Sequence, residues 1–276
     1  FLLPEFALRY FIRRASDFFD WYSGVYEFPT DKDILHREII RLVYLDGDLD
    51  TYQQFTPQQR QEKLAEIKAY LSDSPSLDPV QASQLLHEKG LIHEMGKEYE
   101  QAIASYDRAL EFKPDYHQAW YNRGDALDDL GRFEEAIASF DRALEIKPDD
   151  HEAWNNRGSA LDDLGRFEEA IASYDRALEI KPDYHLAWNN RGIALDNLGR
   201  FEEAIASFDQ AIKINSNDAD AYYNKACCYG LQNNVELAIE NLQRAINLDV
   251  EYQDMAKTDK DFEQIRGDER FQSLLS

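Results

Sequence analysis

The sequence predicts an all-α solenoid, in which pairs of helices repeat along an axis instead of surrounding one central core. A block of 34 residues recurs along the chain, and the copies at 117–150 and 151–184 agree at 29 of 34 positions. A third copy at 185–218 follows in register, with looser copies at 83–116 and 219–252. A fixed period of this length is typical of stacked helical repeats. We therefore expect five stacked repeats.

Each repeat is expected to contain two amphipathic helices. In the copy at 117–150, one apolar stripe at helical spacing consists of Trp120, Gly124 and Leu127. A second stripe consists of Ala136, Ile137, Phe140, Ala143 and Leu144. Gly131 separates the two stripes as a helix stop, and Pro148 ends the second helix. This alternation predicts a helix-turn-helix unit in every repeat.

Residues 1–80 precede the repeats and are expected to form a helical segment of a different kind. Residues 1–28 contain ten aromatic residues, more than one exposed helix tolerates. We expect these aromatic residues to pack on neighbouring helices, with binding to a membrane surface as the alternative. Two helices of this segment are expected near 4–22 and 31–45.

A further helix is expected at 57–71, where the sequence has a strong start signal. Thr56 can cap the helix, Pro57 suits its first turn, and Gln59 can reach back to the cap. The stretch 73–79 then serves as a linker to the first repeat.

Residues 253–276 no longer follow the repeat pattern. The stretch 261–276 has the composition of a polar-faced helix that covers the last repeat. A solenoid needs such cover at its end, so we expect a C-terminal capping helix.

Particular residue types recur at fixed positions when the first residue of each repeat is counted as position 1. A large apolar residue stands at 4, Gly or Ala at 8, a large residue at 11, Ala at 20 and 27, an aromatic residue at 24 and Pro at 32. In the copy at 117–150 these residues are Trp120, Gly124, Leu127, Ala136, Ala143, Phe140 and Pro148. This pattern resembles the tetratricopeptide repeat (TPR) family, with departures at His93 (position 11) and at Ser216 and Val250 (position 32). The resemblance implies a right-handed solenoid whose first helices line a concave surface that holds ligands.

The charge of the chain limits the classes of partner. The formal net charge is −24, which disfavours nucleic acid because phosphate binding needs clustered Lys and Arg. Docking on an anionic membrane surface is disfavoured for the same reason. A basic or zwitterionic protein or peptide is the better match, while the alternative is that the charge keeps a long solenoid in solution.

Cysteine usage and hydropathy indicate the compartment. Cys227 and Cys228 are the only cysteines, and neighbours in sequence rarely form an ordinary disulfide. No stretch approaches the roughly 18 apolar residues that a membrane span requires. These features favour a reducing compartment, and we expect a cytoplasmic protein.

The candidate catalytic and metal sites do not meet the requirements of their chemistry. Asp46, Asp48 and Asp50 suggest a calcium loop, but Thr51 stands where the loop needs Gly and Pro57 where it needs Glu. The recurring histidines are one repeat apart, too far to share a metal ion: His117, His151 and His185. The paired aspartates diverge by about 100° on a helix and lack a partner base: Asp128, Asp129, Asp162 and Asp163. We expect no catalytic residue, metal or cofactor.

Positions 2, 6, 9 and 13 of the first helix lie opposite the packed face, and in repeats two to five we call them the groove stripe. It comprises Gln118, Asn122, Asp125, Asp129, Glu152, Asn156, Ser159, Asp163, Leu186, Asn190, Ile193, Asn197, Asp220, Asn224, Cys227 and Leu231. Positions 2 and 9 differ between near-identical repeats, whereas many exposed charges elsewhere are unchanged. This variation favours a binding surface.

Asn occupies position 6 in four consecutive repeats, at Asn122, Asn156, Asn190 and Asn224. An amide both donates and accepts, so a row of them can pair with the backbone of an extended peptide as a ladder. The alternative is that recent duplication preserved the Asn residues, which then only cap or solvate the helices.

The groove stripe is expected to be polarised along the solenoid. Its N-terminal part offers acidic residues: Asp125, Asp129, Glu152 and Asp163. Its C-terminal part offers apolar residues and a thiol: Leu186, Ile193, Cys227 and Leu231. A matching partner segment would carry a basic residue at one end and an apolar anchor at the other.

These features together predict a non-enzymatic scaffold or adaptor that binds a protein or peptide. The alternative is a regulatory or substrate-recruiting arm of a larger enzyme or NTPase whose catalytic domain lies upstream of residue 1, because the numbering opens without Met. A third possibility is a scaffold that binds membranes through residues 1–28. TPR cochaperones clamp a terminal carboxylate with Lys and Arg, which the groove stripe lacks.

Overall fold

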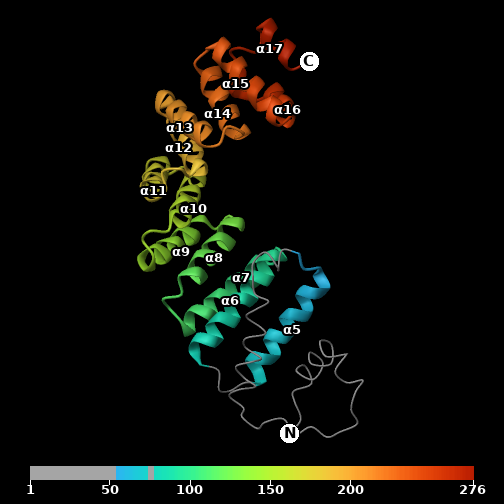
Figure 1. The fold of residues 1–276 in the computed structure, drawn as a ribbon, viewed down its shortest axis with the longest axis vertical. Helices are drawn as coiled ribbons and strands as arrows, with labels where there is room; N and C mark the ends of the chain where they lie inside the picture. The colour runs from blue at the N-terminus through green and yellow to red at the C-terminus, as the bar shows by residue number, and fades with distance from the viewer. Residues whose placement is uncertain (1–53, 74–77) are drawn as a thin grey trace. The chain divides into compact units, whose positions relative to one another are not determined.

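The computed structural model describes residues 54–73 and 78–276, which form helices joined by short turns, with no strand among them (Figure 1). The predicted all-α solenoid is confirmed, because helices in successive repeats pack on one another. The helices expected near 4–22 and 31–45, the packing of residues 1–28 and the aspartates of 46–50 lie outside the described residues.

The helices follow the 34-residue period of the sequence. The first three are α5 Pro57–Asp73, α6 Pro79–Met95 and α7 Tyr99–Phe112. Four pairs of 13 and 14 residues follow: α8 His117–Asp129 and α9 Phe133–Ile146, α10 His151–Asp163 and α11 Phe167–Ile180, α12 His185–Asn197 and α13 Phe201–Ile214, α14 Ala219–Leu231 and α15 Val235–Leu248. The chain ends with α16 Glu251–Thr258, the 3-10 helix η1 Lys260–Phe262 and α17 Glu269–Leu274.

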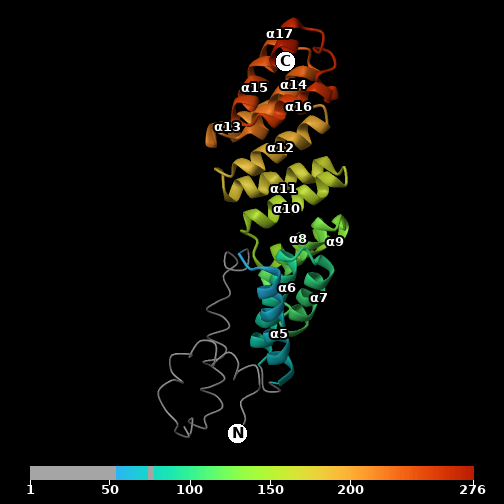
Figure 2. The same cartoon turned by 90° about the vertical axis from the view of Figure 1, so that its right-hand side faces the viewer.

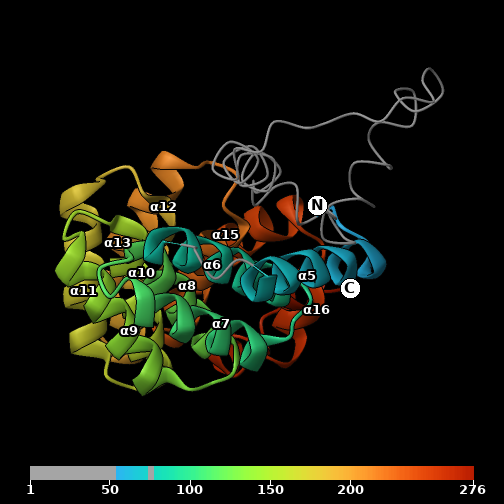
Figure 3. The ribbon, with the colours of Figure 1, turned by 90° about the horizontal axis from the view of Figure 1, so that it is seen from below.

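The chain divides into two compact units, Phe1–Leu130 and Gly131–Ser276. The boundary falls between α8 and α9, inside the second repeat. In the first unit α6 packs on α7 and α8, and α5 lies beside α6 (Figure 3). In the second unit the helices from α9 to α15 pack in chain order, as the layers of α10 to α13 illustrate (Figure 2).

Helix α5 begins with the capping arrangement that its sequence predicts. The backbone N–H of Thr56 donates to Gln59 Oε1 at 2.8 Å, and the backbone N–H of Gln59 donates to Thr56 Oγ1 at 3.3 Å. The helix then buries Ile67 and Tyr70 against α6. The sequence assigned α5 to a separate segment, but its apolar face shares a core with the first helix of the repeats.

Position 15 of every repeat turns the chain between the two helices. Gly131, Gly165 and Gly199 occupy it with φ near +70° in the middle repeats. Lys97 and Asn233 occupy it in the first and fifth repeats, with φ of 57° and 56°. The left-handed conformation recurs even where Gly is absent, because the turn geometry is common to all the repeats.

Within a repeat, the two helices approach closely at position 8. A Cβ added to Gly158 would lie 2.5 Å from Cε1 of Tyr174, which is position 24 of the same repeat. Gly192 and Phe208 stand in the same relation at the same distance. The aromatic ring therefore occupies the space that a side chain at position 8 would need.

Ion pairs join each repeat to the next. Arg157 Nε lies 2.6 Å from Asp141 Oδ1, and Arg191 Nε lies 2.7 Å from Asp175 Oδ1. The same pairing of position 7 with position 25 of the preceding repeat recurs at Lys225. These bonds explain why position 7 is cationic here, although the TPR family usually has an aliphatic residue there.

The C-terminal segment covers the apolar end of the last repeat. Phe262, Ile265 and Phe271 are buried in one cluster with Tyr223 and Leu242 of α14 and α15. The cover comprises α16, η1 and α17, not a single capping helix. Among the described helices, none combines the length and the apolar character needed to cross a bilayer.

Candidate functional site

The groove stripe is accessible at most of its positions, although not at all of them. Its exposed members are Gln118, Asp129, Glu152, Asp163, Leu186, Asn197 and Asp220. Its half-buried members are Asn122, Asp125, Asn156, Ser159, Asn190, Ile193, Asn224 and Leu231. Residues of α8 belong to the first unit, and the remaining stripe residues belong to the second.

Cys227 is the member of the stripe that the sequence placed wrongly. It is only 6% exposed, because the segment after α16 covers it. Its Sγ lies 3.9 Å from Asp259 Oδ2, and Tyr223 donates its hydroxyl to the same oxygen at 2.6 Å. Burial and the nearby charge of Asp259 raise the pKa of the Cys227 thiol, which therefore stays protonated.

Position 6 links the first helices of successive repeats. Asn190 Nδ2 donates to Asn155 Oδ1 at 3.2 Å, and Asn224 Nδ2 donates to Asn189 Oδ1 at the same distance. Both acceptors are buried, and each is 35 residues from its donor. Asn190 and Asn224 therefore have a structural role that neither sequence interpretation included.

The same link exists in the first unit with a different acceptor. Asn122 Nδ2 lies 2.9 Å from His87 Nε2, and His87 stands at position 5 of its repeat like Asn155. Burial lowers the pKa of His87 to about 4, so this imidazole is neutral at physiological pH. The sequence analysis did not predict that position 5 accepts a hydrogen bond from position 6 of the following repeat. The recurrence of Asn at both positions in neighbouring repeats was the signal that could have revealed this link.

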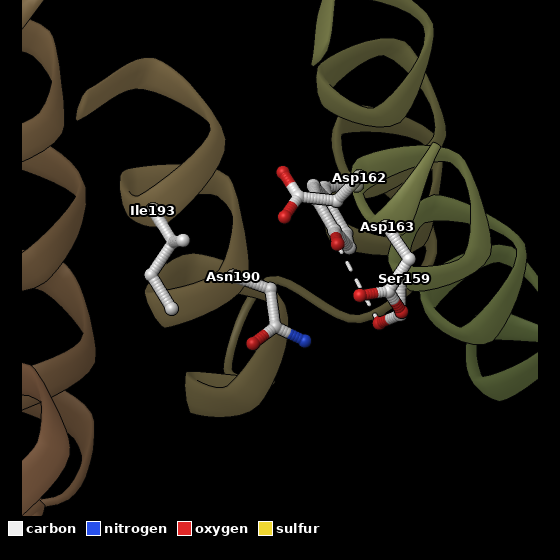
Figure 4. A pocket seen from close by; sticks show the side chains of 6 residues that line it. Ser159, Asp162, Asp163, Asn190 and Ile193 are labelled. Carbon is white, nitrogen blue, oxygen red and sulfur yellow. Dashed lines mark hydrogen bonds between the residues drawn. The ribbon is translucent and has the colours of Figure 1, made fainter. Parts of the chain in front are cut away.

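A pocket of about 190 Å³ opens between α10 and α12, beside the Asn190 link (Figure 4). Its lining comes from three helices: Ser159, Asp162 and Asp163 of α10, Tyr174 of α11, and Asn190 and Ile193 of α12. Asp162 and Asn190 extend into the space from opposite sides (Figure 4). The Tyr174 hydroxyl donates to Ser159 Oγ at 3.5 Å, which fixes one wall.

Asp162 is a half-buried carboxylate in the lining of this pocket. Its Oδ1 is shielded from solvent and accepts no hydrogen bond from the described residues. Burial, reinforced by the charge of Asp163, raises the pKa of Asp162 to about 6. The side chain is therefore a carboxylate at neutral pH that lacks a donor for one of its oxygens.

Asp162 stands at position 12, which the groove stripe does not include. The sequence analysis considered Asp162 only as half of an adjacent carboxylate pair. The recurrence of a carboxylate at position 12 was the available signal, in Glu94, Asp128, Asp162 and Asp196. The sequence could not reveal that one oxygen of Asp162 is shielded from solvent without a donor.

The pocket lies where the two predicted parts of the groove stripe adjoin. Asp163 belongs to the acidic part and Ile193 to the apolar part, and both line this one pocket. Leu186, at 47% exposed, lies on the same helix as Ile193 and keeps the apolar character expected there. In this part of the chain, acidic and apolar groups meet across neighbouring first helices.

Comparisons with known proteins agree with the repeat architecture. Family models described as tetratricopeptide repeat match residues 88–151, 121–185, 185–218 and 207–240. No curated protein sequence matches the chain.

Solved structures share the fold. A crystal structure of MamA is 22% identical, covers 59% of this chain and 95% of its own, and has a TM-score of 0.56. MamA from Desulfovibrio magneticus RS-1 is 17% identical, covers 62% and 96%, and has a TM-score of 0.58. The YrrB structure is 25% identical, covers 67% and 94%, and has a TM-score of 0.56.

Proposed function

The chain belongs to the tetratricopeptide repeat family, and we propose from this premise that it is a non-catalytic scaffold that binds an extended protein or peptide segment along the groove stripe. The observation that carries the proposal is the pocket between α10 and α12, which opens among stripe residues. Its mixture of carboxylates, an amide and an aliphatic wall suits a segment of protein, since binding sites combine apolar surface with a few polar groups.

The position-6 amides support this proposal in a modified form. Asn190 and Asn224 each use one N–H in a link between helices. An amide has a second N–H and a carbonyl oxygen, which can pair with a peptide backbone. The link also holds each amide in a fixed orientation, which lowers the entropy that the amide side chain itself loses when a partner binds.

Similarity to YrrB gives independent support. YrrB is a TPR protein with an unusual peptide-binding site, and its sequence is 25% identical to this chain. We extend to this chain only the class of ligand, a peptide.

The net charge of −24 and the acidic stripe residues favour a basic partner segment. The carboxylates at Asp125, Asp129, Glu152 and Asp163 would orient that segment, while Leu186 and Ile193 would anchor it. Exposed charge pairs contribute about 0–1 kcal/mol, whereas a buried aliphatic anchor contributes about 1.5–3 kcal/mol. Affinity is therefore expected to depend mainly on the apolar contacts.

A random-peptide array probed with the full chain tests the proposal. We expect a set of peptides to bind, and Leu186→Asp to weaken their binding about tenfold because it puts a charge in the apolar contact. Ile214→Asp is the matched control, since Ile214 is also exposed but lies on α13, outside the groove stripe. Equal losses in the two variants, or no bound peptide, would contradict the proposal.

A further inference from the structure

We propose that Cys227, Asp259 and Asp261 form a binding site for a zinc ion that joins the C-terminal cover to the last repeat. Cys227 lies on α14, Asp259 comes directly before η1, and Asp261 lies within η1. The sequence analysis expected no metal and did not consider this set, because Cys227 and Asp259 are 32 residues apart and form no short motif. The inference does not depend on the proposed function.

The three side chains are already close enough to share one ion. The Sγ of Cys227 and one carboxylate oxygen from each of the two aspartates all lie within 4.8 Å of one another. In a tetrahedral site with Zn–S of about 2.3 Å and Zn–O of about 2.1 Å, neighbouring ligand atoms are about 3.4–3.6 Å apart. Cys227 Sγ lies 3.9 Å from Asp259 Oδ2, so small movements of the side chains would complete the site.

The thiol of Cys227 is the group that points to zinc. This residue is 6% exposed, and Asp259 Oδ2, at 3.9 Å, is too far from its Sγ for a strong hydrogen bond. The neighbouring thiol differs, because Cys228, which replaces the Ala194 of the preceding repeat, donates to Asp196 Oδ1 at 2.9 Å. Sulfur and carboxylate oxygen are both zinc ligands, whereas magnesium and calcium take oxygen ligands.

The carboxylates around this thiol concentrate negative charge. Burial, followed by the charges of Asp259 and Asp196, raises the pKa of Asp261. Among the described residues, no basic side chain forms an ion pair with any of these three aspartates. Arg266 donates instead to the backbone carbonyl of Asp259 at 2.5 Å, and Lys260 is exposed. A divalent cation bound there would offset the charge.

The site depends on residues that distinguish the fifth repeat from the others. Its position 12 is Gly230, whereas the other four repeats have a carboxylate there. A Cβ added to Gly230 would lie 2.7 Å from the backbone oxygen of Asp261, so the missing side chain allows η1 to pack directly on α14. Position 9 is Cys in this repeat alone. Tyr223 donates its hydroxyl to Asp259 Oδ2 at 2.6 Å and orients that carboxylate, as outer partners of metal ligands do.

Zinc would replace the proton of the thiol. The S–H bond of Cys227 breaks, its sulfur binds the metal, and the proton passes to the solvent. Each aspartate binds through one oxygen, and because both side chains are half-buried, a water molecule can take the fourth position of the tetrahedron. The ion would bridge α14 and η1, so its binding would stabilise the cover.

Calorimetric titration of the untagged full chain with zinc chloride in a reducing buffer tests the site. We expect one zinc ion to bind per chain, and no comparable binding of magnesium or calcium. Asp261→Asn should weaken zinc binding at least tenfold, because it removes a ligand. Glu263→Gln is the matched control, since Glu263 is an exposed carboxylate of the same segment and should not affect the affinity. Zinc should raise the melting temperature of the wild type but not that of Cys227→Ser.

Cobalt(II) in place of zinc identifies the thiol ligand. The wild type should show the near-ultraviolet band of a thiolate–cobalt bond, Cys227→Ser should lose it, and the matched Cys228→Ser should keep it. Circular dichroism checks that each variant is folded; should Cys227→Ser not fold, the wild-type band and the affinity of Asp261→Asn decide.

Three results would overturn the proposal. They are the absence of zinc binding, equal zinc affinity in the wild type and Asp261→Asn, and magnesium or calcium binding as strong as that of zinc. None of them bears on the groove stripe, so the proposed function is tested separately.

Discussion

At the residue scale, successive repeats have similar residue types at equivalent positions, but their polar side chains form different hydrogen bonds. The carboxylate at position 12 accepts from Tyr106 in the first repeat and from Cys228 in the fourth, yet Asp162 in the third has an open oxygen. The difference arises from single residues such as Ala194, one repeat away. A nearly identical sequence can therefore present a different chemical surface in each repeat.

The first prediction is that the Asp162 carboxylate lowers the free energy of unfolding at neutral pH. Burial raises its pKa from 3.8 to about 6, so between these values the folded chain holds a proton that the unfolded chain releases. The free energy of unfolding should therefore fall as the pH rises from about 4 to about 7. Asp162→Asn should unfold at a higher urea concentration than the wild type at pH 7. The two proteins should converge below pH 4.

The matched control for this prediction is Asp163→Asn, because Asp163 is exposed. That variant should show a much smaller gain at pH 7. If Asp162→Asn were less stable than the wild type at neutral pH, the carboxylate would have a stabilising partner and the open-acceptor interpretation would be wrong.

At the element scale, each repeat depends on a close approach between its two helices. Gly158 faces the ring of Tyr174 in the third repeat, and Gly192 faces Phe208 in the fourth. Ion pairs such as Arg157 with Asp141 then join a first helix to the preceding repeat. The close approach within a repeat is an apolar contact, and ion pairs are added between repeats, which together fix the register of the stack.

Substitution of Gly158 by Ala distinguishes packing from helix propensity. Alanine in an exposed helix stabilises by about 1 kcal/mol relative to glycine, but overpacking of a core costs about 1–3 kcal/mol. We expect a net loss of stability in urea unfolding, because the added Cβ would lie 2.5 Å from Cε1 of Tyr174. A combined Gly158→Ala and Tyr174→Leu variant should lose less than the sum of the two single losses. A gain of stability in Gly158→Ala alone would show that the ring moves freely.

At the scale of the whole molecule, the chain forms two units, and its C-terminal end has a dedicated cover. Phe262, Ile265 and Phe271 bury the apolar end of the last repeat, and the same segment covers Cys227. A stack of repeats ends in an apolar face, so this cover keeps the last repeat from exposing its core.

Removal of residues 253–276 should uncover both the apolar face and the thiol. We expect a lower melting temperature and a greater tendency to aggregate. Cys227 should react much faster with a disulfide reagent such as DTNB, because loss of burial and of Asp259 lowers the pKa of the thiol. A Cys227→Ser version of the truncated chain identifies the reacting cysteine. Unchanged labelling and melting would show that the cover is dispensable.

The sequence by itself determined the helices of the repeats, their pairing and their repeat length. Amphipathic periodicity, the turn at position 15 and the capping residues around Thr56 act over a few residues, and a 34-residue period reproduces them along the chain. The same logic located the groove stripe, because positions on one helical wheel share a face. These features are local, so they can be read without coordinates.

Only the tertiary structure decided which polar groups find partners. Asn190 bonds to Asn155 at a separation of 35 residues, and Cys228 bonds to Asp196 at 32. Such pairs depend on how successive helices pack, and a shift of one helical position would change them. The same dependence buried Cys227 beneath residues that the repeat pattern does not describe, and it left Asp162 open although its sequence neighbours resemble those of Asp196.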